Sequence, residues 1–130
     1  MTLRRRHGSA LLAALVLACS SGDEPIRIGL AGPFSDPVGA PMKRAAELAV
    51  AEINASGGIA GRSVELVARD DFGEPDSAVG VAAELVEASV VAVIGHVFSG
   101  TTLATAPVYN EAGITQISPS STSPRVSDAG

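Results

Sequence analysis

The sequence predicts an α/β fold in which a parallel sheet carries helices on both faces. Short apolar segments alternate with longer segments of helical periodicity, in the order β-α-β-α-β-α-β with brief loops between them. Aromatic residues make up only 3% of the 130 residues, whereas 46% are hydrophobic, so the core is built from alanine, valine, leucine and isoleucine. Such small side chains suit helices that pack closely on a sheet. At this length the chain is one domain or part of a larger one.

The first half of this alternation is a strand, a helix and a second strand. Residues 26–31, IRIGLA, alternate as a strand, and a loop rich in glycine and proline follows. Residues 41–54 space their apolar side chains for one helix face, and Gly57 and Gly58 end the helix. The side chains expected to face inward are those of Met42, Ala45, Ala46, Leu48, Ala49 and Ile53. Residues 63–69, SVELVAR, alternate as the second strand.

The second half adds two helices and two strands. Pro75 suits the first turn of a helix over about 75–88. The side chains expected to face inward there are those of Ala78, Val81, Ala82, Leu85 and Val86. Residues 90–94 are the third strand, and their unbroken apolar character predicts burial on both faces. A third helix is expected over about 99–112, followed by a short fourth strand at 114–118.

The N-terminal segment has the pattern of a secretory signal peptide over residues 1–18. Three consecutive arginines precede an apolar run at 10–18, which is well short of the roughly 20 residues that span a bilayer. Residues 16–19, VLAC, resemble a bacterial lipobox, in which Cys19 would be lipidated and become the new N-terminus. The alternative is an ordinary signal peptide with an incidental cysteine. Residues 19–25 would then be a short tether.

The charge balance argues against a nucleic-acid partner. Removal of residues 1–18 would take away three of the nine basic residues and none of the fourteen acidic ones. The acidic residues are scattered along the chain, and no basic patch survives the cleavage. This balance favours solubility.

Two hydroxyl-rich segments mark the candidate site. IGHVFSGTTL at 94–103 and ISPSSTSP at 117–124 directly follow the third and fourth predicted strands, so they should lie at the same edge of the sheet. Ser99 lies where a helix begins, and free backbone N–H groups attract anions there; alternatively, Ser99 is only the N-cap. The second segment contributes Ser120, Ser121 and Thr122. Such neutral donors and acceptors suit a carboxylate or a zwitterion.

The sequence offers little support for catalysis or for a metal. His96 and Ser99 are three residues apart, but no acidic residue is obviously placed to orient the histidine, and the pattern G-x-S-x-G is absent. A hydrolase that uses these two residues is the minor alternative. Asp70, Asp71 and Glu74 could hold a metal, although such a cluster at a strand end is more often a solvated turn. We expect no enzyme activity, no catalytic residues, no metal and no cofactor.

Five segments together resemble one family. They are IGLAGPFS at 28–35, AVAEINASGGIAGR at 49–62, VELVARDD at 64–71, VAVIGHVFSGTTLATAPVY at 91–109 and AGITQISPSSTSP at 112–124. In order and spacing they resemble type I periplasmic substrate-binding proteins of the branched-chain amino acid (Leu/Ile/Val-binding) ABC transporter family. The resemblance implies that residues 26–130 are the N-terminal part of a first ligand-binding lobe of Rossmann-like α/β architecture, incomplete in this chain.

The resemblance also implies a function and roles for the site residues. It implies an extracytoplasmic solute-binding component, in the periplasm or at the cell surface and anchored at Cys19, that delivers an amino acid to an ABC permease. Ser99 would contact the ligand carboxylate. The loop after the fourth strand would supply hydroxyl and backbone contacts to the carboxylate and the ammonium of the ligand, and its matching positions are Ser120, Ser121 and Thr122. Ser120 would act mainly through its carbonyl, and Thr122 through its hydroxyl and N–H. The alternative is the ligand-sensing domain of a receptor or regulator, since the same fold serves sensing.

Two departures from the family pattern concern the rim of this site. The loop at 35–42 is about three residues shorter than usual, which puts specificity for leucine in doubt. Some members carry a disulfide between the loops after the second and third strands, and the matching positions here are Gly73 and Phe98.

Overall fold

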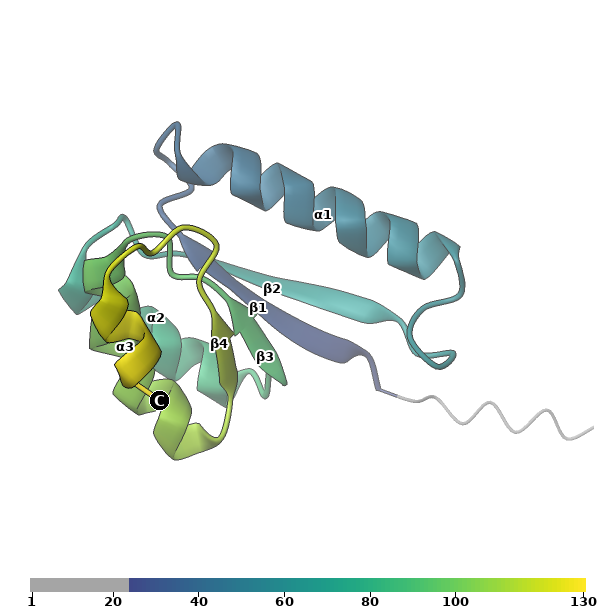
Figure 1. Ribbon diagram of the computed structural model, residues 1–130. Coiled ribbons are helices and arrows are strands. Elements are labelled where there is room, and N and C mark those ends of the chain that lie inside the picture. The colour runs from purple at the N-terminus through teal and green to yellow at the C-terminus, as the bar shows by residue number, and fades with distance from the viewer. Residues whose placement is uncertain (1–23) are drawn as a thin grey trace, which may run out of the picture.

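The computed structural model describes residues 24–130, so the predicted signal peptide and Cys19 lie outside the described part of the chain. Strands and helices alternate in the predicted order (Figure 1). The elements are β1 (Ile26–Gly32), α1 (Gly39–Ala55), β2 (Val64–Asp70), α2 (Pro75–Glu87), β3 (Ala92–Ile94), α3 (Ser99–Ala112), β4 (Thr115–Ile117) and the 3₁₀ helix η1 (Pro124–Asp128). Between residues 24 and 130, no helix is long and apolar enough to cross a membrane.

The four strands form one parallel sheet in the order β2-β1-β3-β4. β1 lies inside the sheet and pairs with β2 along its whole length, from Ile26 opposite Val64 to Gly32 opposite Asp70. α1 covers one face of the sheet over β1 and β2, whereas α2 and α3 pack together on the other face (Figure 1). The predicted class, a parallel sheet with helices on both faces, is therefore confirmed.

The main core lies between the sheet and the α2–α3 pair. Its fully buried members are Ala31 and Val93 from the sheet, Ala82 and Leu85 from α2, and Tyr109 from α3. Gly29 allows α2 to pack closely, because a Cβ at this position would lie 2.9 Å from Val93 Cγ2 and 3.2 Å from Leu85 Cδ1. The inward face that periodicity predicts for α2 is confirmed, with Val86 partly buried at its edge.

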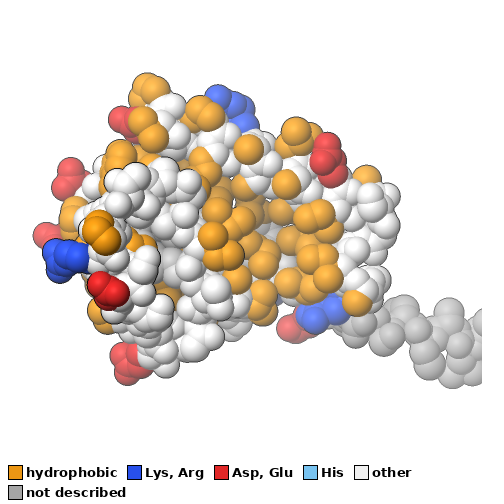
Figure 2. Space-filling view, in the orientation of Figure 1, with side chains coloured by type: hydrophobic (Ala, Val, Ile, Leu, Met, Phe, Trp, Pro, Cys, Tyr) orange, Lys and Arg blue, Asp and Glu red, His pale blue; other side chains and the backbone are white. Residues whose placement is uncertain are grey.

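The opposite face of the sheet is covered only in part. α1 lies over β1 and β2 and leaves β3 and β4 open, so Ile117 is 58% exposed. Figure 2 shows apolar side chains gathered on this face. Burial of the third strand on both faces was predicted, and this is wrong, because within β3 only Val93 is fully buried. The inward face predicted for the first helix is also wrong in part. Ala45, Leu48 and Ala49 are exposed, whereas Met42, Ala46 and Ile53 are partly buried.

The ends of the elements differ from the predicted ones for local reasons. α1 begins at Gly39, two residues before the predicted start, because Gly39 has no side chain to collide with the Pro33 carbonyl. β3 and β4 are shorter than predicted. The N–H of Val90 donates to the Leu85 carbonyl and that of Ile114 to the Tyr109 carbonyl, so these two residues end the preceding helices.

The core predicts that two leucines contribute very differently to the free energy of unfolding. Leu85 is fully buried, whereas Leu48 on α1 is 61% exposed. We expect Leu85→Ala to lower the free energy of unfolding by about 2–5 kcal/mol, because it removes buried methyl groups and leaves a cavity. Leu48→Ala is the matched control and should change it by less than about 0.5 kcal/mol. Denaturant unfolding of both variants checks this, and equal effects would contradict the assigned core.

Candidate functional site

The candidate site lies at the edge of the sheet where the parallel strands end. Loops 33–38, 71–74, 95–98 and 118–123 extend from the carboxyl ends of β1, β2, β3 and β4 (Figure 1). The chain order reverses at β1, since β2 lies on one side of it and β3 on the other. In open α/β sheets the ligand crevice forms at this reversal, beyond the carboxyl ends of the strands.

Ser99 joins the two hydroxyl-rich segments. It is the first residue of α3 and is partly buried. Its Oγ accepts hydrogen bonds from the N–H groups of Thr122 and Ser123, each at 3.2 Å. The N-cap position of α3 is Phe98, so Ser99 does not fill the cap role that the sequence left open. The structure thus brings the N-terminus of α3 and the loop after β4 together through one serine hydroxyl.

Ser121 belongs to a cluster of hydroxyl groups behind this contact. Its Oγ lies 2.6 Å from Ser118 Oγ and 2.8 Å from Thr102 Oγ1. Ser118 and Thr102 in turn donate to the carbonyl of His96, at 2.7 Å and 2.9 Å. The Ser121 hydroxyl thus contacts two other hydroxyls of the protein, and its predicted role in ligand binding stays a prediction.

Ser120 and Thr122 lie at the exposed rim of the same loop. The Ser120 hydroxyl donates to the Val97 carbonyl at 2.7 Å, so this hydroxyl already has a partner within the protein. Thr122 is exposed, and its N–H points toward Ser99 Oγ. The structure thus brings all four predicted site residues together at one edge of the sheet.

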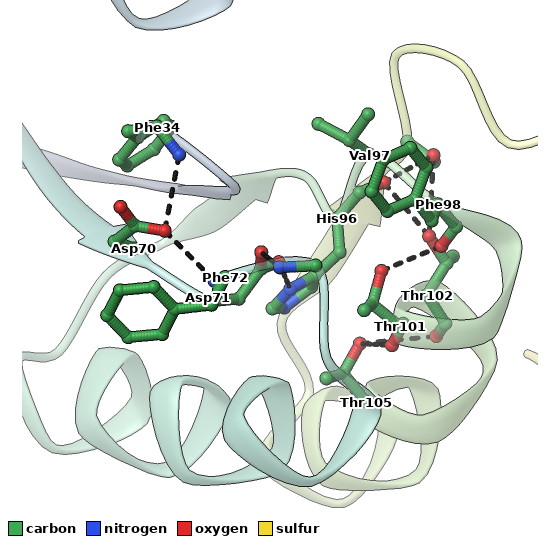
Figure 3. A network of polar contacts seen from close by, with 12 residues as sticks. Phe34, Asp70, Asp71, Phe72, His96, Val97, Phe98, Thr101, Thr102 and Thr105 are labelled. Carbon is green, nitrogen blue, oxygen red and sulfur yellow. Dashed lines mark hydrogen bonds and ion pairs between the residues drawn. The ribbon is translucent and has the colours of Figure 1, made fainter. Parts of the chain in front are cut away.

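A buried histidine links the loops after β2 and β3, and this link was missed in the sequence. His96 Nδ1 lies 2.6 Å from Asp71 Oδ2 (Figure 3). His96 Nε2 lies 3.1 Å from the Tyr109 hydroxyl. All three side chains are fully buried. Burial, with a smaller contribution from the Asp71 charge, raises the pKa of Tyr109 well above its ordinary value. The expectation that no acidic residue orients His96 is therefore wrong.

This network does not form a catalytic relay with Ser99. The second ring nitrogen of His96 contacts Tyr109 rather than a serine, and the imidazole is closed off from solvent. Asp70 accepts hydrogen bonds from the loop after β1, whereas Asp71 contacts His96. The two carboxylates therefore do not face a common point (Figure 3). Within residues 24–130, no group of three His, Cys, Asp or Glu side chains is arranged to hold a metal ion.

Asp70 fastens the loop after β1 to the loop after β2. Its carboxylate accepts hydrogen bonds from the N–H groups of Phe34 and Ser35, from the Ser35 hydroxyl at 2.8 Å, and from the N–H of Phe72. Partial burial acts to raise the pKa of Asp70, but these hydrogen bonds outweigh it and hold the pKa below the ordinary 3.8. The clamp positions the short loop that forms one rim of the site.

The two positions matched to a family disulfide lie in direct contact. A Cβ at Gly73 would be 2.8 Å from Phe98 Cε2, so the phenyl ring packs against the glycine backbone. Gly73 also has a positive φ of 73°, a conformation that glycine adopts without strain. The loops after β2 and β3 are thus held together by packing and by the Asp71–His96 contact.

The fold defines a class of protein, namely α/β domains with a parallel sheet whose loops converge beyond the carboxyl ends of the strands. A comparison with protein families matches residues 25–130 to the family described as periplasmic binding protein. The chain therefore belongs to the periplasmic binding protein family. This confirms the family resemblance of the five segments.

Named relatives and solved structures of amino-acid-binding proteins are similar to this chain. The chain is 44% identical over 107 residues to an amino acid binding protein of Pseudomonas aeruginosa, covering 79% of this chain and 29% of that protein. It is 37% identical over 129 residues to the Leu/Ile/Val-binding protein of Escherichia coli, covering 95% of this chain and 35% of that protein. The substrate-binding protein LivJ of Streptococcus pneumoniae, solved in complex with isoleucine, superposes with a TM-score of 0.77 at 37% identity. That match covers 81% of this chain and 31% of LivJ.

These relatives are considerably longer than the matched region. The chain spans between 29% and 35% of the length of the two curated relatives named above. The same holds for an ABC transporter substrate-binding protein of Desulfitobacterium hafniense in complex with Leu, which superposes with a TM-score of 0.74 at 40% identity. That match covers 82% of this chain and 32% of that protein.

The Asp70 clamp predicts a pH-dependent contribution to stability. Because its pKa is lower in the folded than in the unfolded chain, the carboxylate stabilises the fold above the ordinary value of 3.8. This contribution is lost as the pH falls through the lower folded value. Asp70→Asn should therefore be less stable than wild type at about pH 7, and the difference should shrink toward about pH 3. Urea unfolding at several pH values measures this difference. Asp128→Asn, exposed in η1, is the control, and a pH-independent difference for Asp70→Asn would contradict the clamp.

Proposed function

We propose that this chain contributes the ligand-binding edge of an extracytoplasmic solute-binding protein, which captures a branched-chain amino acid or a similar small polar molecule. The observation that carries the proposal is the geometry of Ser99. Its Oγ accepts two backbone N–H groups from the loop after β4, at 3.2 Å each. A serine hydroxyl has one donor and two acceptor positions, so the O–H of Ser99 remains to donate to an anion.

The chemistry of this edge suits the carboxylate of an amino acid. Ser99 opens the 14-residue helix α3, whose first N–H groups and positive dipole end favour negative charge. Thr122 and Ser120 are exposed residues of the same loop. A threonine hydroxyl can donate to a carboxylate, and a backbone carbonyl can accept from an ammonium group. Neutral groups can therefore hold both ends of a zwitterion without a basic side chain. The solved relatives with isoleucine and with Leu bound support this class of ligand.

The domain assignment and the partner follow from the same proposal. Residues 26–130 would form the first part of one lobe, because the chain covers about a third of the relatives it matches. A second lobe would close on the ligand, as in hinged binding proteins. The partner would be an ABC permease, and the relatives named as transporter binding proteins support this. The proposal makes the protein a binding protein rather than an enzyme.

The proposed location rests on the N-terminal sequence and on the family. Residues 1–18 would be removed as a signal peptide, and Cys19 would carry the lipid that anchors the protein outside the cytoplasm. Two lines of support are the short apolar run before the cysteine and the family to which the chain belongs.

The ligand site predicts a loss of affinity in two variants of the full-length gene product. Ser99→Ala removes a donor and the acceptor of two N–H groups, and Thr122→Ala removes a rim hydroxyl. Each should weaken the binding of leucine, isoleucine or valine by about 1–3 kcal/mol in isothermal titration calorimetry, because a polar partner is left unsatisfied.

Ser127→Ala, an exposed serine in η1, is the matched control and should leave the affinity unchanged. Unchanged affinity in both Ser99→Ala and Thr122→Ala would remove these residues from the site. Absence of binding of all three amino acids by the wild-type protein would instead contradict the proposed ligand class.

The proposed anchor predicts a change of location in one variant. Cys19→Ser leaves the signal peptide in place but removes the thiol that would be lipidated. We expect wild-type protein in the membrane fraction, with a mass increase at the N-terminal cysteine. The variant should lack the lipid, so the added mass should disappear. A wild-type chain of unmodified mass would show that the cysteine is incidental.

A further inference from the structure

The buried network around His96 lies next to the proposed site without reaching its surface. Asp71 and His96 are fully buried, and their side chains meet at 2.6 Å between Oδ2 and Nδ1. Asp71 Oδ1 also accepts the N–H of Gly73 at 2.8 Å. Because a buried carboxylate needs hydrogen-bonding partners, this pair holds the loop after β2 and the loop after β3 in one fixed arrangement.

The backbone that carries His96 in turn holds the loop after β4. The His96 carbonyl accepts the hydroxyls of Thr102 and Ser118, and the Val97 carbonyl accepts the hydroxyl of Ser120. Ser118 also accepts the N–H of Ser121, at 3.1 Å. These contacts hold residues 118–121 against residues 96–97. The next two residues, Thr122 and Ser123, donate their N–H groups to Ser99 Oγ.

We propose that Asp71 and His96 are positioning residues for the ligand site. By fixing the backbone of residues 96–97, the pair holds the loop after β4 so that the N–H groups of Thr122 and Ser123 reach Ser99 Oγ. Neither side chain touches a ligand, since both have no exposed surface. The consequence for affinity rests on the proposed function, whereas the consequence for the loop does not.

The hydrogen-bond pattern supplies a conservative variant. A carboxylate can only accept, so His96 Nδ1 is the donor in the contact with Asp71, and a neutral imidazole then accepts at Nε2 from the Tyr109 hydroxyl. In Asp71→Asn, the amide oxygen can accept from Gly73 N–H, and the amide NH₂ can donate to Nδ1. His96 then changes tautomer, and its Nε2–H donates to the Tyr109 oxygen. Asp71→Leu keeps a similar volume but removes both contacts of the carboxylate.

The first experiment compares the two variants in the full-length protein with leucine as the probe. Asp71→Asn should bind within about threefold of wild type and show the changed tautomer in the ¹⁵N spectrum of the imidazole. Asp71→Leu should bind about tenfold more weakly, because the histidine and the Gly73 N–H lose their partner. Equal affinity of Asp71→Leu and wild type would overturn the proposal.

A double-mutant cycle with Ser99→Ala separates positioning from a general loss of stability. If Asp71 acts through Ser99, then Asp71→Leu should cost much less affinity in the Ser99→Ala background than in wild type. Additive effects of the two substitutions would overturn the proposal, because they would mean that Asp71 acts elsewhere.

Amide hydrogen exchange tests the same inference without any ligand. The N–H groups of Thr122 and Ser123 should exchange at least about threefold faster in Asp71→Leu than in wild type, whereas Asp71→Asn should retain the protection. Tyr109→Phe removes only the hydroxyl that contacts His96, so it should increase the two exchange rates by less. This variant takes the place of Asp71→Leu if the latter does not fold. Unchanged exchange at both amides would overturn the positioning role even if leucine binds. Failure of leucine binding by wild type, with the exchange changes present, would instead contradict only the proposed function.

Discussion

The carboxylate of Asp71 has no exposed surface, and the edge of the sheet is organised around its hydrogen bonds. A charge in this position is costly unless it is fully paired, which restricts the loops that surround it. The Gly73 N–H and the His96 ring meet the two oxygens of Asp71, and Tyr109 on α3 completes the histidine's contacts. One buried acid therefore relates two loops and a helix from separate parts of the chain.

The adjacent acid, Asp70, shows how a strand end can serve two loops at once. Asp70 is the last residue of β2, opposite Gly32, and its carboxylate fastens the loop after β1. Asp71, the next residue, contacts His96 in the loop after β3. Two identical side chains in sequence thus have different partners, different burial and different roles.

Part of this structure could be predicted from local patterns. The order of the elements and the inward face of α2 follow from periodicity and from the glycine and proline signals, and both were predicted. The open face of the sheet over β3 and β4 was not predicted. Periodicity shows that α1 has an apolar side, but it does not show which strands α1 will cover. Ser99 and Ser120 were placed at the edge by their positions after strands. The Asp71–His96 contact was missed because 25 residues separate its members, and nothing local to either residue indicates the pairing.

The position of Tyr109 gives the chain an unusual optical property. The sequence contains one tyrosine and no tryptophan, so the near-ultraviolet absorption of the chain at wavelengths beyond the phenylalanine bands arises from this ring. The ring is fully buried, and its hydroxyl contacts His96. Tyrosine emission, and near-ultraviolet circular dichroism beyond the phenylalanine bands, therefore come from a single chromophore next to the point where the loops converge. The polypeptide thus carries its own spectroscopic label there, without any engineered dye.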